Sequence, residues 1–197
     1  MICAMILAAG ESRRMGTPKL LLPFKGKTMI ETLVDEVLRS KSDKTMVVLG
    51  AEKEKIERII SRLPVAIVVN TRYEEGMLSS IQAGFEALPD EVDAVLVCLG
   101  DQPLIPFFVL DRLIEAYKDT KKGIIIPVYK KSRGHPILID IKYKPEIKRI
   151  SPDIGLRALV HDQSQDVMEV EVDAPQILKD IDKPEDYMRA LKKKEEA

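Results

Sequence analysis

The sequence predicts an α/β fold in which helices cover both faces of a doubly wound, mostly parallel β-sheet. Short β-rich runs alternate with longer segments whose apolar residues recur at helical spacing. Several of the β-rich runs are apolar throughout, which is typical of parallel strands that are buried on both faces. With 197 residues, of which 45% are hydrophobic, the chain can bury one sizeable core, so residues 1–197 are interpreted as a single domain.

The predicted parallel strands are five short runs that precede residue 130. Each is dominated by Val, Ile, Leu or Met and is shorter than an ordinary helix. The five runs comprise residues 1–7, 44–50, 65–70, 93–100 and 123–129.

Helical spacing is clearest in residues 28–39, where the apolar side chains fall on one face. Thr28 and Glu31 have the spacing of a capping box at the start of this segment. Residues 52–63 repeat the apolar pattern. We therefore expect a helix in each of these segments, between consecutive strands.

Two further helices are expected from the residues at which they begin. Ser79 and Gln82 have the spacing of a second capping box, which predicts a helix from Ser79 through Leu88. Proline is favoured in the first helical turn because its missing N–H would be unpaired there anyway. Pro106 therefore indicates a helix over residues 106–117.

The alternation of strands and helices changes after residue 128. Residues 134–141 and 166–172 are predicted strands, the second with polar residues at alternate positions, and residues 153–160 are a predicted short helix. We expect a small antiparallel addition here, such as a hairpin at one edge of the sheet. A last helix is expected to begin near Pro184 and to fray in the charged tail "LKKKEEA".

Charge and cysteine content exclude several classes of protein. The formal net charge is −1, so no global basic field indicates nucleic-acid binding, and no apolar run is long enough to span a membrane. The N-terminus lacks the basic residues of a signal peptide. Cys3 and Cys98 lie in apolar runs, which is typical of buried thiols in a reducing compartment. We therefore expect a cytoplasmic protein.

A glycine-containing loop with three cations follows the first predicted strand. Ligands in open α/β sheets bind beyond the carboxyl ends of the strands, and Gly10 lets the backbone approach a ligand there. Arg14 and Lys19 are a forked donor and a mobile point charge, and both suit phosphate oxygens. Neither the Walker nor the dinucleotide fingerprint fits the spacing. An ordinary surface loop with solvated cations is the alternative.

The loop sequence "LAAGESRRMGTPKLLLP" resembles the signature L-A-A-G-x-S-x-R-M-G-x-x-K of the MobA-like nucleotidyltransferases. It is most similar to their molybdenum-cofactor cytidylyltransferase branch, in which L-L-L-P follows the lysine. The segments "NTRYEEGMLSSI", "LGDQPLI", "RGHPIL" and "DIDKPEDY" follow in the family's order. The resemblance implies a Rossmann-like nucleotidyltransferase fold, Mg²⁺ as cofactor, and transfer of CMP from CTP to the phosphate of molybdopterin or its molybdenum form.

The resemblance also implies which residues bind the nucleotide. Arg14, Lys19 and Asp101 are expected to be catalytic, because two cations near the departing pyrophosphate and a carboxylate near a metal suit phosphoryl chemistry. Capping of a helix is the alternative role of Ser79. The expected nucleotide-binding residues are Leu7, Ala8, Ala9, Gly10, Arg14, Lys19, Asn70, Gly76 and Ser80.

Asp101 and Asp182 are the expected metal ligands, a role that the resemblance implies for both. Mg²⁺ favours oxygen ligands, usually one or two carboxylates with phosphate oxygens and water. Asp101 could instead cap a turn, and Asp182 with Glu185 has the spacing of a capping box. Asp180 is a competing metal ligand that ranks below Asp182, because the family's D-x-P-E-D pattern begins at Asp182.

Arg133 and His135 are the expected acceptor-binding residues, since the segment "RGHP" faces the second substrate in the family. A structural role for His135 is the alternative, and His161 receives no function. Other readings are a GTP-dependent or purine-catabolism type of MobA-like transferase, a sugar-phosphate nucleotidyltransferase, and a non-catalytic chaperone that delivers cofactor to a molybdoenzyme. A dinucleotide-dependent oxidoreductase is disfavoured because the glycine fingerprint is absent.

Overall fold

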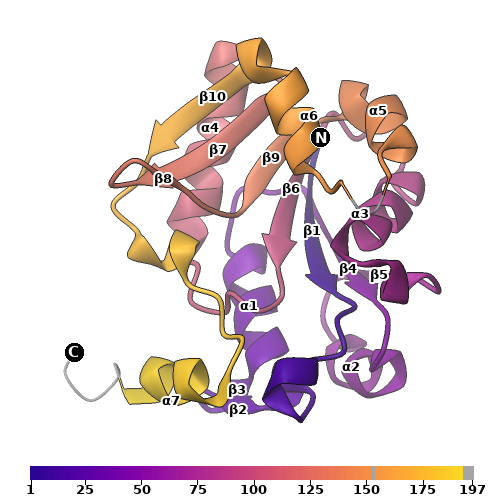
Figure 1. Cartoon of the computed structure of the whole chain (residues 1–197), viewed down its shortest axis with the longest axis vertical. Coiled ribbons are helices and arrows are strands. Elements are labelled where there is room, and N and C mark those ends of the chain that lie inside the picture. Colours follow the sequence, from indigo (N-terminus) through magenta and orange to yellow (C-terminus); the bar gives the residue numbers. More distant parts are fainter. Residues whose placement is uncertain (152–153, 193–197) are drawn as a thin grey trace.

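A computed structural model describes residues 1–151 and 154–192 of the chain (Figure 1). These residues form a mixed eight-stranded sheet with the strand order β10-β7-β9-β6-β1-β4-β5, and β8 pairs with β7. A separate antiparallel pair joins β2 to β3. The strands are β1 Ile2–Ala8, β2 Pro23–Phe24, β3 Lys27–Thr28, β4 Lys44–Leu49, β5 Ala66–Val69, β6 Ala94–Leu99, β7 Ile124–Tyr129, β8 Ser132–Arg133, β9 Ile137–Asp140 and β10 Val167–Glu171.

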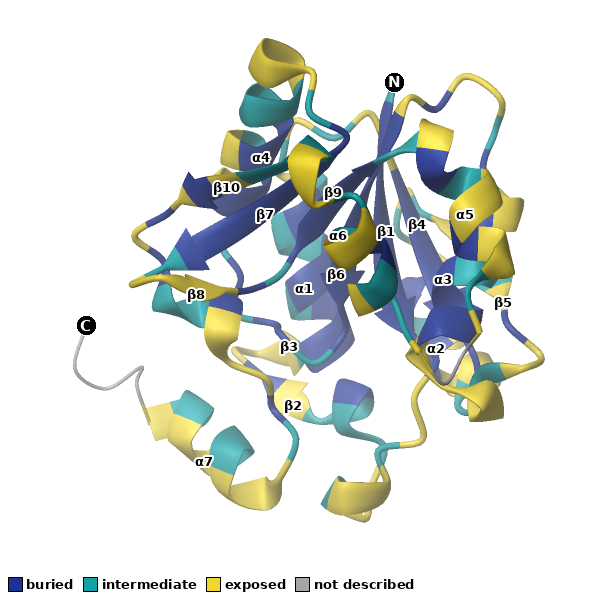
Figure 2. Ribbon diagram, turned by 45° about the horizontal axis from the view of Figure 1, so that its top comes forward, coloured by how far each residue is buried: buried dark blue, intermediate teal, exposed yellow. Residues whose placement is uncertain are grey.

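The first part of the sheet is parallel, as the sequence predicts. β1 lies between β4 and β6 and is parallel to both, with Ala8 opposite Leu49 and Leu7 opposite Leu99. β1 and β6 are buried along their whole length, which explains why their sequences do not alternate (Figure 2). Because these strands run in one direction, the loops after β1, β4 and β6 meet at the same edge of the sheet.

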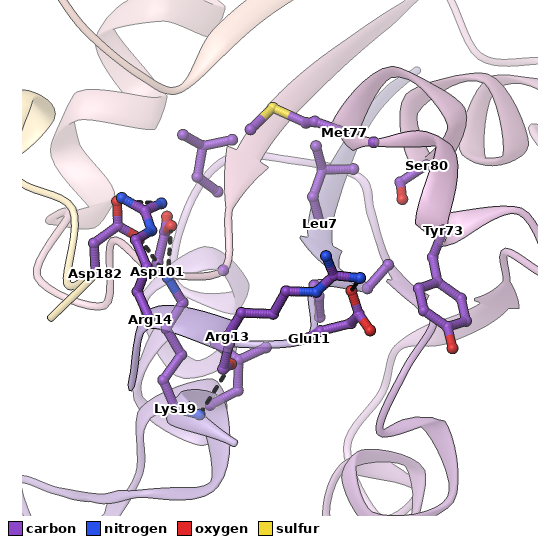
Figure 3. A pocket seen from close by; sticks show the side chains of 18 of the residues that line it. Leu7, Glu11, Arg13, Arg14, Lys19, Tyr73, Met77, Ser80, Asp101 and Asp182 are labelled. Carbon is purple, nitrogen blue, oxygen red and sulfur yellow. Dashed lines mark hydrogen bonds and ion pairs between the residues drawn. The ribbon is translucent and has the colours of Figure 1, made fainter. Parts of the chain in front are cut away.

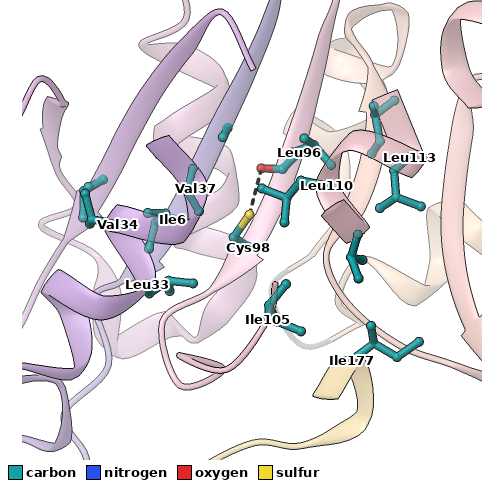
Figure 4. Packing of buried hydrophobic residues seen from close by; sticks show 14 of the residues in the cluster. Ile6, Leu33, Val34, Val37, Leu96, Cys98, Ile105, Leu110, Leu113 and Ile177 are labelled. Atoms are coloured by element: carbon teal, nitrogen blue, oxygen red, sulfur yellow. Dashed lines mark hydrogen bonds between the residues drawn. The ribbon is translucent and has the colours of Figure 1, made fainter. Parts of the chain in front are cut away.

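Helices cover both faces of the sheet. Side chains of α1, α2 and α4 pack with Ile2, Ala4 and Ile6 of β1, whereas side chains of α3, α5 and α6 pack with the residues between them. Figure 4 shows the first of these clusters, with Ile6 beside residues of α1 and of the α4 region. The helices are α1 Met29–Leu38, α2 Lys53–Ile60, α3 Met77–Glu86, α4 Phe107–Thr120, α5 Lys144–Arg149, α6 Arg157–Asp162 and α7 Pro184–Lys192.

The predicted start of α1 is confirmed, and that of α3 is wrong. Thr28 caps α1 and forms the capping box with Glu31. α3 instead follows Gly76, whose φ of 100° is readily adopted by glycine, and it begins before Ser79. The Gln82 side chain points away from this terminus and donates to backbone carbonyls of the α5 segment. A glycine turn therefore sets the start of this helix in place of a capping box.

The second half of the sheet contains the expected antiparallel pairing at an unexpected place. β9 is antiparallel to both β6 and β7 and lies between them, inside the sheet. Its residues Ile137, Leu138 and Ile139 are buried, which shows that both faces of the sheet are covered at this strand. β10 lies at the edge of the sheet, which suits its alternating sequence. It pairs with β7 in parallel, whereas an antiparallel addition was expected at the edge. β7 also forms a short antiparallel hairpin with β8.

Several other expectations can be compared with the described residues. Pro106 lies at the N-cap of α4, one position before the first turn. The predicted start of a helix at residue 153, and most of the tail "LKKKEEA", lie outside the described residues. Cys3 and Cys98 are free and buried, as the sequence predicts. Within the described ranges, no helix combines the length and apolar character needed to cross a bilayer.

Candidate functional site

The loop after β1 folds back and forms one side of a cavity of about 430 Å³ (Figure 3). Ser12 has a left-handed backbone with a φ of 55°, and its hydroxyl accepts a hydrogen bond from the Lys19 N–H at 3.1 Å. Gly16 follows the 3₁₀ turn Arg13–Met15 with a φ of 65°, a conformation that favours glycine. These two turns direct Lys19 back toward the cavity.

The strand end and the loop contribute backbone as well as side chains to this cavity. Apart from Gly10 itself and its two chain neighbours, no described residue has an atom within 4 Å of the place where a Gly10 Cβ would be, so the backbone faces open space there. Gly100 differs, because its Cβ would lie 2.6 Å from the Leu7 carbonyl oxygen and packing alone requires a glycine. The expected loop residues that line the cavity are Leu7, Ala8, Ala9, Gly10, Arg14 and Lys19.

Lys19 joins two carboxylates that are far apart in the sequence. Its Nζ lies 2.9 Å from Asp101 Oδ2 and 2.8 Å from Asp182 Oδ1. Asp182 Oδ2 also lies 2.9 Å from the Arg14 guanidinium. The side chains of Lys19, Asp101 and Asp182 are 14%, 23% and 24% exposed, so this cluster is largely shielded from water. The structure thus brings Arg14, Lys19, Asp101 and Asp182 together at one end of the cavity.

The two carboxylates differ in their electrostatic environment. Burial raises the pKa of Asp101, and the Lys19 ammonium only partly offsets this effect. Burial also raises the pKa of Asp182, but the hydrogen bond and charge of Lys19, with those of Arg14, outweigh it and lower that pKa below its ordinary value. Asp101 Oδ1 is buried and has no hydrogen-bond partner among the described residues. It is therefore an oxygen still available to a ligand.

The expected capping box at α7 is wrong. Both oxygens of Asp182 face cations of the opening loop. Asp186 Oδ2 instead accepts the backbone N–H of Lys183 at 3.1 Å and that of Asp182 at 3.4 Å. The cations of a distant segment thus engage both Asp182 oxygens, and Asp186 binds the backbone that leads into α7.

Gly76 and Ser80 line the cavity, whereas Asn70 does not belong to its wall. Asn70 is only 2% exposed, and its Nδ2 donates to the Ser79 and Ser80 hydroxyls at 2.8 and 3.0 Å. Its Oδ1 accepts the Arg72 N–H at 2.9 Å. The polar atoms of Asn70 are thus used internally, where they fix the turn that presents Ser80, and its direct contact with a nucleotide stays a prediction.

Further residues line this cavity that the sequence did not single out as binding residues. Arg13 and Tyr73 lie within the loop and motif segments that were recognised, so their proximity to those motifs was the available signal. Arg13 is paired with Glu11 at 2.7 Å. The additional lining residues are Glu11, Ser12, Arg13, Leu20, Tyr73, Glu74, Met77, Leu99 and Gly100.

A second cavity, of about 920 Å³, shares Met77 and Leu99 with the first. Its wall is mainly apolar and is built from α3, α6, β6, β7 and β9. The cationic or titratable residues among its lining are Arg133, His135, Arg157 and His161, and the described lining includes no carboxylate. The expected acceptor residues thus lie together in a cavity that adjoins the loop cavity, and Arg157 is an addition that no local motif indicated.

The two expected acceptor residues differ in availability. Arg133 Nε lies 2.6 Å from Glu169 Oε1, so an ion pair already engages its charge. His135 is half-buried, and burial lowers the pKa of its imidazole. Its backbone N–H donates to the Ile177 carbonyl at 3.1 Å, which leaves the ring free of that structural role. His135 is therefore expected to face a ligand mainly as a neutral hydrogen-bonding group.

The residues at the mouth of the first cavity suit a divalent cation. Asp101 and Asp182 converge on one ammonium group, and one buried carboxylate oxygen remains unpaired. The described residues include no group of three or more His, Cys, Asp or Glu side chains that could hold a metal. An ion here would therefore rest on two carboxylates and on oxygens of a ligand, which is the usual arrangement for Mg²⁺.

Comparison with known proteins identifies the family. Residues 4–167 match the sequence model of the MobA-like NTP transferase domain. The chain belongs to this family. The MobA-like domain is 29% identical over 193 residues to the molybdenum cofactor cytidylyltransferase of Escherichia coli, with 96% of this chain and 95% of that protein covered. It is also 29% identical over 199 residues to the nicotine blue oxidoreductase of Paenarthrobacter nicotinovorans, with 96% of each covered.

Solved structures support the same fold for the MobA-like domain. Rv0371c of Mycobacterium tuberculosis superposes with a TM-score of 0.86 at 28% identity over 97% of each chain. A nucleotidyl transferase of Methanothermobacter superposes with a TM-score of 0.83 at 25% identity, covering 98% of this chain and 97% of that one. A manganese complex of Rv0371c superposes with a TM-score of 0.82 at 26% identity over 97% of this chain and 98% of that one. The MobA-like domain is thus a nucleotidyltransferase by family, and a related structure holds a divalent metal.

Proposed function

We propose that this MobA-like domain transfers CMP from CTP to the phosphate of a pterin acceptor, molybdopterin or its molybdenum form, with release of pyrophosphate. The observation that carries the proposal is the convergence of Asp101 and Asp182 on Lys19 at the mouth of the loop cavity. That arrangement gathers two metal-binding carboxylates and a phosphate-binding cation at the edge where α/β sheets bind ligands. The similarity to the E. coli cytidylyltransferase favours CTP and the pterin acceptor.

The triphosphate is proposed to lie along the glycine loop, with its phosphates near the backbone of Gly10 and the side chains of Arg14 and Lys19. Asp101 and Asp182 would hold Mg²⁺, which when bound neutralises phosphate charge and orients the phosphates for in-line attack. If Asp101 and Asp182 held the ion, the Lys19 ammonium that they now bind would be available to donate to phosphate oxygens. Ser80 is proposed to contact the nucleoside.

The acceptor is proposed to occupy the second cavity. A flat ring system suits its apolar wall, while His135, Arg157 and Arg133 suit the anionic groups of a phosphorylated acceptor. An oxygen of the acceptor phosphate forms a bond to the α-phosphorus, and the bond from the α-phosphorus to the bridging oxygen of pyrophosphate breaks. An ionised phosphate is already a nucleophile, so positioning and charge neutralisation suffice without a side-chain base.

The experiment is an assay of pyrophosphate release with CTP, Mg²⁺ and molybdopterin. Turnover that depends on all three supports the proposal, and GTP in place of CTP measures the base preference. Nucleotide binding without turnover would favour the alternative of a delivery chaperone. Because one relative is named a nicotine blue oxidoreductase, a redox assay with nicotine blue is a parallel measurement. Activity there, with no pyrophosphate release, would overturn the proposal.

Two parts of the proposal rest on the sequence alone. The protein is proposed to act in the cytoplasm and to supply its product to a molybdoenzyme. Co-purification of a molybdoenzyme with the protein, and its loss of activity in cells without this protein, would test the second part.

A further inference from the structure

Gln102 is a buried polar residue directly after Asp101, and it contacts the segment that carries Asp182. It is 2% exposed, and its Nε2 donates to Asp180 Oδ1 at 2.7 Å. The same nitrogen lies 3.4 Å from the Ile177 carbonyl oxygen. The side chain thus connects the loop after β6 to a segment that follows it by more than 70 residues in the chain.

The orientation of this amide is set by its partner. A carboxylate oxygen only accepts hydrogen bonds when ionised, so the NH₂ group of Gln102 must face Asp180. Gln102 Oε1 is then buried, and it has no hydrogen-bond partner among the described residues. An unpaired buried oxygen destabilises a fold and calls for an explanation. Because Asp180 is exposed and can be hydrated, stability alone does not account for glutamine at this position.

The backbone makes a second connection between the same two segments. The Ile181 N–H donates to the Asp101 carbonyl at 2.9 Å, and the Ile181 side chain packs in a cluster with Phe24 and Met29. Asp182 is the next residue, and its carboxylate lies on the Lys19 ammonium together with that of Asp101. The backbone bond holds the segment at Ile181, and the Gln102 amide holds it at the residue before.

From these contacts we propose that Gln102 is a positioning residue: its amide holds Asp180 so that Asp182 faces Asp101 across the metal site. This inference rests on the proposed function, since the pair must bind a metal with the nucleotide. The hydrogen bonds at Asp180 and Ile181 together fix both the distance of this segment from the loop after β6 and its rotation. The backbone bond at Ile181 alone would leave the segment free to rotate. Positional errors of about 1 Å in a site can cost about a hundredfold in rate, so such restriction has a measurable effect.

The test uses Mn²⁺ as a spectroscopic probe. Because CTP itself binds Mn²⁺, the electron paramagnetic resonance signal of free Mn²⁺ with CTP is compared in the presence and absence of the protein. Gln102→Met keeps the length of the side chain and removes the amide. We expect it to weaken Mn²⁺ binding in the presence of CTP by roughly tenfold, the order expected when an outer partner that orients a metal ligand is removed. The melting temperature should stay the same or rise, because the unpaired oxygen is removed as well.

Gln82→Met is the matched control. Gln82 also joins two segments through its amide, with bonds of 2.9 and 3.0 Å to the Ile147 and Ile150 carbonyls, but it lines neither cavity. It should leave Mn²⁺ binding unchanged. Asp180→Ala should resemble Gln102→Met, and the double variant should lose no more than either single variant, because both remove the same contact.

The possible outcomes separate the two hypotheses. Wild-type protein that binds no Mn²⁺ with CTP would overturn the proposed function and this inference with it. Wild-type binding that is retained in Gln102→Met would overturn the inference and leave the proposed function standing. Additive losses in the double variant would also overturn it, since Gln102 would then act by a route other than Asp180.

Discussion

Replacement of Lys19 should change metal and nucleotide affinity in opposite directions. In the absence of ligands the Lys19 ammonium binds both carboxylates that are proposed to hold the metal. Lys19→Met keeps most of the side chain and removes this competing cation. The affinity for free Mn²⁺ should therefore rise, whereas the affinity for CTP should fall, because a phosphate-binding charge is lost.

The expected magnitude follows from the two contacts of 2.9 and 2.8 Å. Hydrogen bonds to charged groups contribute about 1.5–3 kcal/mol each, and about 1.4 kcal/mol corresponds to a tenfold change in affinity. At the lower value, two such bonds would give about a hundredfold change in affinity. Because each carboxylate is about one quarter exposed, solvent screening reduces the expected gain in Mn²⁺ affinity to about tenfold.

The assay is a titration of Mn²⁺ followed by paramagnetic resonance without nucleotide, paired with calorimetric titration of CTP at the same ionic strength. Arg13→Met is the control, because Arg13 lines the same cavity but pairs with Glu11. It should leave the affinity for Mn²⁺ unchanged. If Lys19→Met binds free Mn²⁺ no more tightly than the wild type, the ammonium does not compete for the metal position and the reasoning fails.

Three further predictions concern individual side chains. Asp101→Asn should abolish pyrophosphate release in a folded protein. Because burial raises the pKa of Asp101, the ionised wild-type carboxylate destabilises the fold at a pH above that raised pKa, and the uncharged variant should have the larger free energy of unfolding there. Urea titrations at several pH values should show this difference vanish as the pH falls through the raised pKa. His135→Gln should raise the KM for the acceptor without changing the CTP affinity measured by calorimetry. An equal loss of CTP binding would contradict the role of His135 in binding the acceptor alone. Burial raises the pKa of Cys3 to about 11 and that of Cys98 to about 12, so both thiols should resist a thiol reagent at neutral pH until the protein unfolds; rapid labelling of the native protein would refute this.

Features that depend on neighbours along the chain could be predicted from the sequence. The apolar runs of β1 and β6 identified buried parallel strands, and the chain order of strands and helices identified the α/β class. Thr28 and Glu31 identified the start of α1, because both capping bonds are made within one helical turn. The glycine and the cations of the first loop were predicted to lie at a ligand site because they follow the carboxyl end of a strand, where such folds bind ligands.

Capping-box spacings predicted the wrong contacts at the starts of α3 and α7, where other residues compete for the same backbone or side-chain groups. Ser79 and Gln82 had the spacing of a capping box, but Gly76 supplied a turn that begins α3 earlier. Asp182 and Glu185 also had the spacing of a capping box, but both oxygens of Asp182 pair with cations of the opening loop. In each case the alternative local arrangements differ little in free energy, so other contacts determined which one formed.

The tertiary structure alone decided how the site is connected. The sequence suggested that Asp101 and Asp182 share a metal ion, but it did not reveal that Lys19 binds both carboxylates. Nor did it reveal that Asn70 is buried behind the cavity wall, where it binds the hydroxyl of Ser79. β9 likewise took an interior position that its sequence did not reveal. Helix caps and strand burial depend on residues a few positions apart, whereas these contacts depend on the order of strands in the sheet and on where the last segment crosses its edge. That order is set by the packing of the whole core, which no short stretch of sequence contains.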